Sequence, residues 1–296
     1  MTLKFSKRVN RFWERLERPH GALFGSVFLF SLFALVIHAT AQIHLGPVLI
    51  RENAITIFGF LPDAIITSAG LLRLMQVVTL LALTAWVFHF ALPVSPWITC
   101  IAFTFIAAQE IETMHYTPHM YHILVVGLFG ASVWYATSYR ELAKVRTAAS
   151  LIEQPIMPRW VTFFVLAYLT ITYTYSGLTK LGVSGISWTN GTSLQLWAYL
   201  WADADSMLRN YILEHKNFAQ LLQGSVLLFE TTAILALCIS RLRPLYGVVL
   251  VSFHLGTELL FSFQFYGNIV LGLLVFVVEP LIYWRETELK GGSPLE

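Results

Sequence analysis

The residue best placed to do chemistry is Lys180, at the end of the apolar stretch YTYSGLTKLGVSGISW, residues 173–188. The nearest other lysine or arginine residues along the chain are Arg159 and Arg209. Removing an ammonium from water favours the neutral amine, which can act as a base. A lysine at the end of a membrane helix can equally extend to the lipid headgroups. The stretch alone leaves both interpretations open.

Other ionisable side chains are predicted deep in the protein or near its non-cytoplasmic side. They are His38, His44, Glu110, Glu112, His115, His119, His122, Glu230, His254 and Glu258. Ionisable groups inside a bilayer cost free energy, so they usually face a cavity or one another. We therefore expect a polar pocket that opens away from the cytoplasm. Glu230, in LLFETTAIL, needs either a partner or a proton, and His254 and Glu258 share one helix face.

The segment HYTPHMYH has the histidine spacing of a metal site, but the sequence predicts no metal here. Pro118 interrupts the helix on which His115 and His119 would share an ion. Membrane di-iron enzymes also need about eight histidines in three groups, whereas this chain has one group. Cys100 and Cys238 form neither a disulfide framework nor a zinc site.

Composition defines the elements that must position these residues. Of the 296 residues, 56% are hydrophobic and 12% charged, and the mean hydropathy is +0.66. Soluble domains carry about 25% charged residues, so the sequence predicts an all-α, polytopic transmembrane bundle with about eight spans. Their predicted ranges are roughly 21–44, 71–92, 96–112, 119–138, 159–180, 218–240, 244–262 and 267–284. Between the spans, Ser193 to Trp201 predicts a short interfacial helix anchored by tryptophans.

Positive charge predicts the orientation and the division of the chain. Residues 1–19 read as a basic, amphipathic cytoplasmic segment, 20–284 as the transmembrane domain, and 285–296 as a cytoplasmic tail that is in part a vector remnant. With eight spans the most basic segments all lie on one side, so both termini are expected in the cytoplasm. These cations lie at membrane edges, so the net charge of +2 does not indicate nucleic-acid binding.

Three segments together resemble one family. SGLTKLGVSGISWTNG is similar to a lysine-containing segment of vitamin K-dependent gamma-carboxylases, with matches that include Gly177, Lys180 and Trp188. FHLGTELLFSF matches a second segment through His254 and Phe261. PHMYHILVVGLF matches a third through His119 and Tyr121, and Glu230 falls where the family tends to carry a glutamate. The order and spacing resemble the HTTM domain, the membrane part of those enzymes, over roughly residues 20 to 284.

The resemblance implies a site and its cofactor. Lys180 corresponds to the lysine proposed to deprotonate a lipid quinol, and His119 and His254 are the other expected catalytic residues. The residues expected to bind the cofactor are Tyr121, Tyr175, Trp188, Glu230 and Phe261. The cofactor would be a vitamin K hydroquinone-like lipid quinol, used with oxygen and in some reactions carbon dioxide. Thr179 stands where the family has the first of two lysines.

Two classes of function follow from the resemblance. In the first, the protein is a quinol-dependent enzyme of a bacterial inner membrane that modifies a peptide or small substrate. Propeptide recognition in animal carboxylases uses a large lumenal portion that has no counterpart after the last span, so a partner protein is expected to recognise the substrate. In the second, the protein is a non-catalytic accessory protein for maturation or export of a secreted peptide. A transporter is less consistent, because no inverted repeat is visible.

Overall fold

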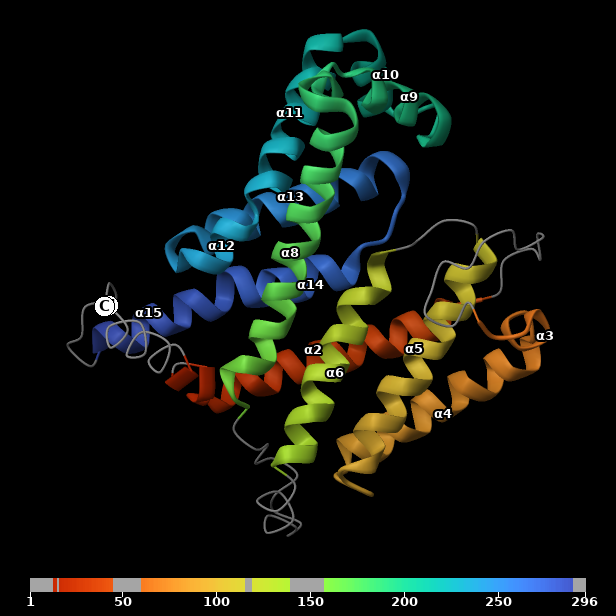
Figure 1. Ribbon diagram of the computed structural model, residues 1–296, viewed down its shortest axis with the longest axis vertical. Helices are drawn as coiled ribbons and strands as arrows, with labels where there is room; N and C mark the ends of the chain where they lie inside the picture. Colours follow the sequence, from red (N-terminus) through yellow and green to blue (C-terminus); the bar gives the residue numbers. More distant parts are fainter. Residues whose placement is uncertain (1–12, 15, 45–59, 115–118, 139–156, 290–296) are drawn as a thin grey trace. The chain divides into compact units, whose positions relative to one another are not determined.

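The computed structural model describes residues 13–14, 16–44, 60–114, 119–138 and 157–289. All regular elements in these ranges are helices, so the all-α prediction is confirmed. The chain divides into two compact units, Met1–Phe164 and Val165–Glu296, and each is described by itself. Figure 1 labels the helices of both units along the sequence.

The first unit contains four apolar helices of at least 16 residues and two short elements. The long helices are α2 (Ala22–Gln42), α4 (Ala69–Val87), α5 (Val94–Met114) and α6 (His122–Thr137). The short elements are α3 (Asp63–Ile66) and η1 (His119–Tyr121), and the first turn of α8 completes the unit. Helix α2 packs against α4, α5 and α6. Ser68 begins α4 by accepting a hydrogen bond from the Leu71 amide at 3.2 Å, as an N-cap serine does.

The second unit holds the rest of α8 and all later elements. Helix α8 (Arg159–Ser184) leads through η3 (Gly185–Thr189) into the short helices α9 (Thr192–Trp201) and α10 (Met207–Glu214). Helices α11 (Lys216–Thr232), α12 (Ile234–Cys238), η4 (Ser240–Leu242) and α13 (Arg243–Phe261) follow. The last apolar stretch forms α14 (Tyr266–Leu273), the π-helical turn η5 (Leu274–Val278) and α15 (Glu279–Leu289). The helix predicted from Ser193 to Trp201 is therefore present as α9.

Six helices of the described ranges are long and apolar enough to cross a membrane. They are Leu23–Gln42, Ala69–Val87, Val94–Glu112, Arg159–Thr189, Ser240–Phe261 and Tyr266–Arg285. The chain is therefore a multi-pass integral membrane protein whose apolar helices require a lipid bilayer. The predicted count of eight spans is not confirmed. The stretch 119–138 forms a 16-residue apolar helix, and 218–240 divides into α11 and α12 at Ala233.

Candidate functional site

One face of α8 carries the polar residues that precede Lys180. Counted from Tyr173, this face continues at i+3, i+4 and i+7, which are Ser176, Gly177 and Lys180. Residues i, i+3, i+4 and i+7 share one side of an α-helix. Each of the four contacts another element of the second unit on that side, as described below.

Lys180 forms an ion pair with Glu230 of α11. The Lys180 Nζ donates to Glu230 Oε1 at 2.6 Å and also contacts Oε2, so the ammonium faces both carboxylate oxygens. The side chain of Glu230 is only 5% exposed, whereas that of Lys180 is 27% exposed. Ser176 Oγ lies 3.4 Å from Glu230 Oε1. A buried carboxylate needs such partners, so Lys180 supplies the partner that the sequence around Glu230 required.

Gly177 allows α8 and α11 to approach closely enough for this pair. A Cβ atom at Gly177 would lie 2.6 Å from the Thr231 amide nitrogen and 2.9 Å from the Glu230 carbonyl carbon. No side chain larger than hydrogen fits at such distances. The glycine therefore brings the backbone of α8 against α11 one turn before Lys180.

Trp188 of η3 covers the ammonium from a second side. The Lys180 Nζ lies 4.9 Å from the centre of the Trp188 ring, which is a cation–π distance. Gln223 of α11 donates from Nε2 to the Trp188 carbonyl oxygen at 2.9 Å. Lys180 therefore contacts both a carboxylate and an indole, and α11 contributes to both contacts.

A second polar group begins on the same face of α8, at Tyr173. Its hydroxyl forms a short hydrogen bond with His254 Nε2 of α13. Asn268 Nδ2 of α14 donates to the same hydroxyl at 3.2 Å. The Tyr173 ring also packs on Phe229, with ring centres 5.4 Å apart, next to Glu230 in the chain. Tyr173 therefore links α8 to α11, α13 and α14.

Two buried atoms of this group have no hydrogen-bond partner in the described structure. They are His254 Nδ1 and Asn268 Oδ1, and both side chains are at most 5% exposed. Tyr173 accepts from Asn268 and can donate its own proton to His254 Nε2, which leaves the imidazole proton on Nδ1. The group then offers one donor and one acceptor, which matches the needs of a hydroxyl group.

His254 and Glu258 do not pair with each other, although they share a face of α13. The histidine contacts Tyr173, and its ring lies 4.6 Å from that of Phe265. Glu258 Oε1 instead accepts from the Tyr266 hydroxyl at 2.9 Å. Each group thus has a separate partner from another element.

The remaining predicted residues of the second unit make no described contact with the ion pair. Tyr175 is on α8 but is 72% exposed. Phe261 packs with Trp197 of α9, at 6.4 Å between ring centres, beside the apolar cluster of Ala198, Ile212, Ala219 and Leu260. Thr179 is exposed and its hydroxyl donates to the Tyr175 carbonyl at 2.8 Å. The Thr179 hydroxyl is therefore bonded within its own helix.

His119 and Tyr121 belong to the first unit. His119 begins η1, and its side chain lies outside the described part of the structure. Tyr121 is buried and hydrogen-bonds Glu110 of α5, which also interacts with His44. Glu110 and Glu112 are both 3% exposed. The first unit thus contains a buried acidic group that includes Tyr121.

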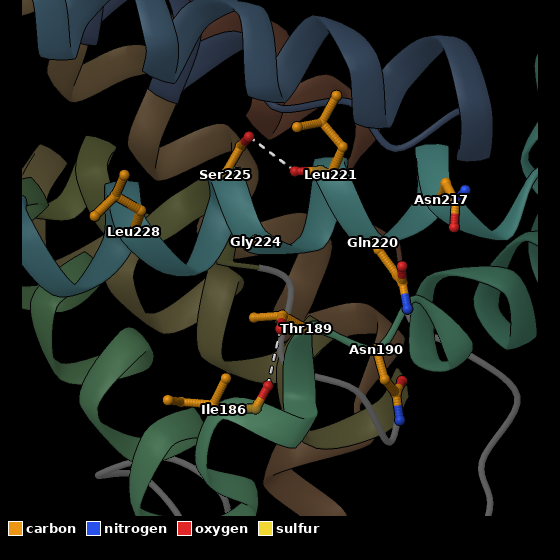
Figure 2. A pocket seen from close by; sticks show the side chains of 9 residues that line it. All are labelled: Ile186, Thr189, Asn190, Asn217, Gln220, Leu221, Gly224, Ser225 and Leu228. Carbon is orange, nitrogen blue, oxygen red and sulfur yellow. Dashed lines mark hydrogen bonds between the residues drawn. The ribbon is translucent and has the colours of Figure 1, made fainter.

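The hollow drawn in Figure 2 lies elsewhere on α11. It has a volume of about 730 Å³ and is lined by Ile186, Thr189, Asn190, Asn217, Gln220, Leu221, Gly224, Ser225 and Leu228. None of these residues is ionisable. Its leucines are on the exposed side of α11, opposite the buried Gln223, Leu227 and Glu230. The hollow is therefore not where acid–base chemistry would take place.

The sequence did not single out Gln223 and Asn268. Both are neutral amides within apolar helices, where charge and hydropathy give little signal. The spacing of Gln223 and Glu230, seven residues apart, could have placed both on one helix face. The described residues contain no group of three or more His, Cys, Asp or Glu side chains arranged to hold a metal ion.

Comparison with protein families gives one match. The model of the HTTM domain matches residues 22–280, which is most of the chain and extends from the start of α2 to the first residues of α15. No curated protein and no solved structure matches the chain.

Proposed function

Because this chain belongs to the HTTM domain family, we propose that it binds a lipid quinol and uses Lys180 as the base in an oxygen-dependent modification of a peptide or small substrate. The observation that carries the proposal is the ion pair of Lys180 and Glu230. A partly exposed amine that contacts a buried carboxylate can exchange protons with a ligand on one side and with the carboxylate on the other.

The residues around Lys180 suit an aromatic, apolar ligand. The Trp188 ring lies against the ammonium. Next to the pair, α8 and η3 expose apolar side chains: Tyr175 at 72%, Leu178 at 56%, Val183 at 82% and Ile186 at 80%. Lipid-facing apolar residues around one polar group are what a quinol of the membrane requires, with its ring near the amine and its tail in lipid. His254 Nδ1 and Asn268 Oδ1 add unsatisfied polar atoms suited to a hydroxyl.

Proton transfer by the pair follows from its geometry. When bound, a quinol supplies a phenolic proton and the electrons that reduce oxygen. Lys180 can pass one of its protons to Glu230 along the 2.6 Å contact and so become a neutral amine. The amine can then accept the phenolic proton, and the pair ends with an ammonium beside a protonated carboxyl. Glu230 therefore stores the extra proton, and the ammonium is kept beside the new negative charge.

Oxygen and, for a carboxylation, carbon dioxide are the expected co-substrates, and a partner protein would present a peptide substrate. We place the protein in a bacterial inner membrane with both termini in the cytoplasm. The basic segments of residues 1–19 and 139–159 support this orientation.

The test is anaerobic quinol binding followed by oxygen consumption in purified protein. Wild type, Lys180→Met and Glu230→Gln are compared with Lys216→Met, which removes an exposed lysine at the start of α11. We expect the rate of oxygen consumption to fall by at least about 100-fold in Lys180→Met and in Glu230→Gln, which is the scale of a lost general base. Lys216→Met should behave as wild type.

Equal oxygen consumption by wild type and Lys180→Met would end the catalytic proposal. Absence of quinol binding to wild type, together with stable co-purification of a secreted peptide or its maturation enzyme, would instead support the accessory function. In that case the ion pair serves only to hold α8 against α11.

A further inference from the structure

The segment from Gly185 to Gly191, here called the Trp188 cap, lies beside Lys180. It is attached to α11 through the Gln223 side chain and through the packing of Gly191 against Gln220 and Lys216. We propose that Gln223 is a positioning residue that holds the Trp188 cap over Lys180 and so sets the access of a planar aromatic ligand to the amine. Only the identity of that ligand rests on the proposed function. The positioning itself is a property of the contacts between η3, α9 and α11.

Gln223 uses both ends of its amide on the cap and the residues that follow it. Its Nε2 donates to the Trp188 carbonyl at 2.9 Å, and its Oε1 accepts from the Leu194 amide at 3.3 Å. The side chain is 3% exposed. A buried amide that loses these partners could not replace them with water, so the contacts favour one position of the cap.

Gln223 is also on the same side of α11 as Glu230. The two residues are seven apart, and Leu227 between them is buried as well. One helix face therefore supplies the carboxylate that pairs with Lys180 and the amide that holds Trp188. The two contacts of the amine are fixed relative to each other by the rigidity of α11.

The glycines at the two ends of the cap differ in their surroundings. Gly185 has φ +60°, and a Cβ there would meet nothing within 4 Å. Gly191 has φ +84°, and a Cβ there would lie 3.1 Å from the Lys216 carbonyl and from Gln220. Both backbone conformations favour glycine. The end at Gly191 is packed against α11, whereas the position of a side chain at Gly185 faces open space.

This arrangement explains how a ligand could reach Lys180. The Lys180 ammonium contacts Glu230 and lies 4.9 Å from the centre of the Trp188 ring. Rotation about Gly185 would move the ring and open the amine without breaking the ion pair. A flat aromatic ring can then take the place of the indole beside the ammonium or stack on it. The cap thereby favours planar aromatic head groups.

The test measures how fast the amine of Lys180 reacts. Purified protein in detergent is acetylated with N-hydroxysuccinimidyl acetate, and each lysine is followed by peptide mass spectrometry. Lys216 is exposed and serves as the internal reference. We expect Gln223→Leu to raise the acetylation rate of Lys180 relative to Lys216 by roughly fivefold or more, as for the loss of one or two hydrogen bonds.

Gln195→Leu is the matched control. The side-chain amide of Gln195, in α9, also donates to two backbone carbonyls, those of Ile212 and Leu213 at 3.1 and 3.0 Å. The contact of Gln195 with the cap is made by its backbone amide, which donates to the Gly191 carbonyl at 3.0 Å and is retained in Gln195→Leu. This variant should leave the reactivity of Lys180 unchanged. Equal Lys180 rates in Gln223→Leu and Gln195→Leu would overturn the proposal.

A second pair of variants keeps the test decisive if Gln223→Leu does not fold. Trp188→Leu should raise the Lys180 rate, and Trp188→Phe, which retains an aromatic face, should restore most of the protection. Equal acetylation rates of Lys180 in Trp188→Leu, Trp188→Phe and wild type would show that the Trp188 ring does not protect the amine. The readout needs no quinol, so it separates this inference from the proposed function. Where quinol is turned over, Gln223→Leu should raise KM more than it lowers kcat.

Discussion

Lys180 and Glu230 are 50 residues apart in the chain, and the Lys180 ammonium contacts both carboxylate oxygens of Glu230. The two partners differ in their access to solvent: the carboxylate is 5% exposed and the lysine side chain 27%. Removing the lysine therefore leaves a buried carboxylate without a partner, whereas neutralising the glutamate leaves a partly exposed lysine. This asymmetry gives a test of the pair that is independent of any activity.

Removing the lysine should destabilise the protein more than neutralising the glutamate. Lys180→Met leaves a buried carboxylate without its cation, at a cost of about 3 kcal/mol. Glu230→Gln leaves a lysine that can reach solvent, at a cost of about 1 kcal/mol. The measurement is thermal unfolding in detergent at pH 7, with Lys216→Met as the control. An equal loss in both variants would contradict the difference in burial.

A methyl group at Gly177 should separate α8 from α11. In Gly177→Ala the new Cβ would meet backbone atoms of Glu230 and Thr231 at 2.6–2.9 Å, and overpacking of this kind costs about 1–3 kcal/mol. Gly182→Ala is the matched control on the same helix, because a Cβ there meets nothing within 4 Å. It should be neutral or stabilise by up to about 1 kcal/mol. Unfolding of the two variants at the same temperature would refute the close approach.

The Tyr173 hydroxyl should contribute to stability, whereas that of Tyr175 should not. Tyr173→Phe leaves His254 Nε2 and Asn268 Nδ2 without the partner that they share. A buried polar group without a partner costs about 1–3 kcal/mol. Tyr175→Phe changes a side chain that is 72% exposed, so its unfolding temperature should equal that of wild type. If Tyr173→Phe and Tyr175→Phe unfold at the same temperature, the hydrogen bonds of the Tyr173 hydroxyl do not stabilise the protein.

His20 should make the stability of the protein fall in acid. It lies before the first span, is 5% exposed, and its Nε2 is 3.0 Å from Thr162 Oγ1. Burial, aided by the charge of Arg159, lowers the pKa of His20 from 6.5 to about 3. Between these values the unfolded chain binds a proton that the folded chain does not, so stability is complete above pH 6.5 and falls as the pH decreases towards 3.

The slope from one such group is at most about 1.4 kcal/mol per pH unit. His20→Gln retains a donor for Thr162 and does not titrate. Unfolding of both proteins in denaturant between pH 7 and 4 isolates the contribution as the difference between their slopes. Parallel curves would show that His20 does not titrate on unfolding.

The sequence predicted most of the helices because apolar stretches of about twenty residues have few other stable forms in a membrane. It did not predict that 218–240 divides at Ala233. There the amide of Ile234 is satisfied by Thr174 Oγ1 of α8, at 2.9 Å, and a contact between residues 60 positions apart leaves no local signal. The sequence did indicate a helix interruption before His119, at Pro118, and η1 begins at His119.

The sequence could single out the polar residues of the site, but it could not predict which of them contact each other. Lys180, Glu230 and His254 were all noticed because a charge or imidazole within an apolar stretch is unusual. Which of them meet depends on Gly177 and on the packing of α11, α13 and α14. The sequence placed His254 and Glu258 on one helix face and left open whether they pair; in the structure His254 contacts Tyr173. The grouping of His119 with these residues stays a prediction.

Helix α8 has a length that bears on where a ligand would meet the ion pair. From Arg159 to Lys180 the helix rises about 32 Å, at about 1.5 Å per residue. The hydrocarbon core of a bilayer is about 30 Å thick, so a helix that enters it at Arg159 leaves it near Lys180. The amine then lies level with the glycerol region of one leaflet. A lipid whose polar head is at that level can reach it by lateral diffusion, without leaving the leaflet in which it resides.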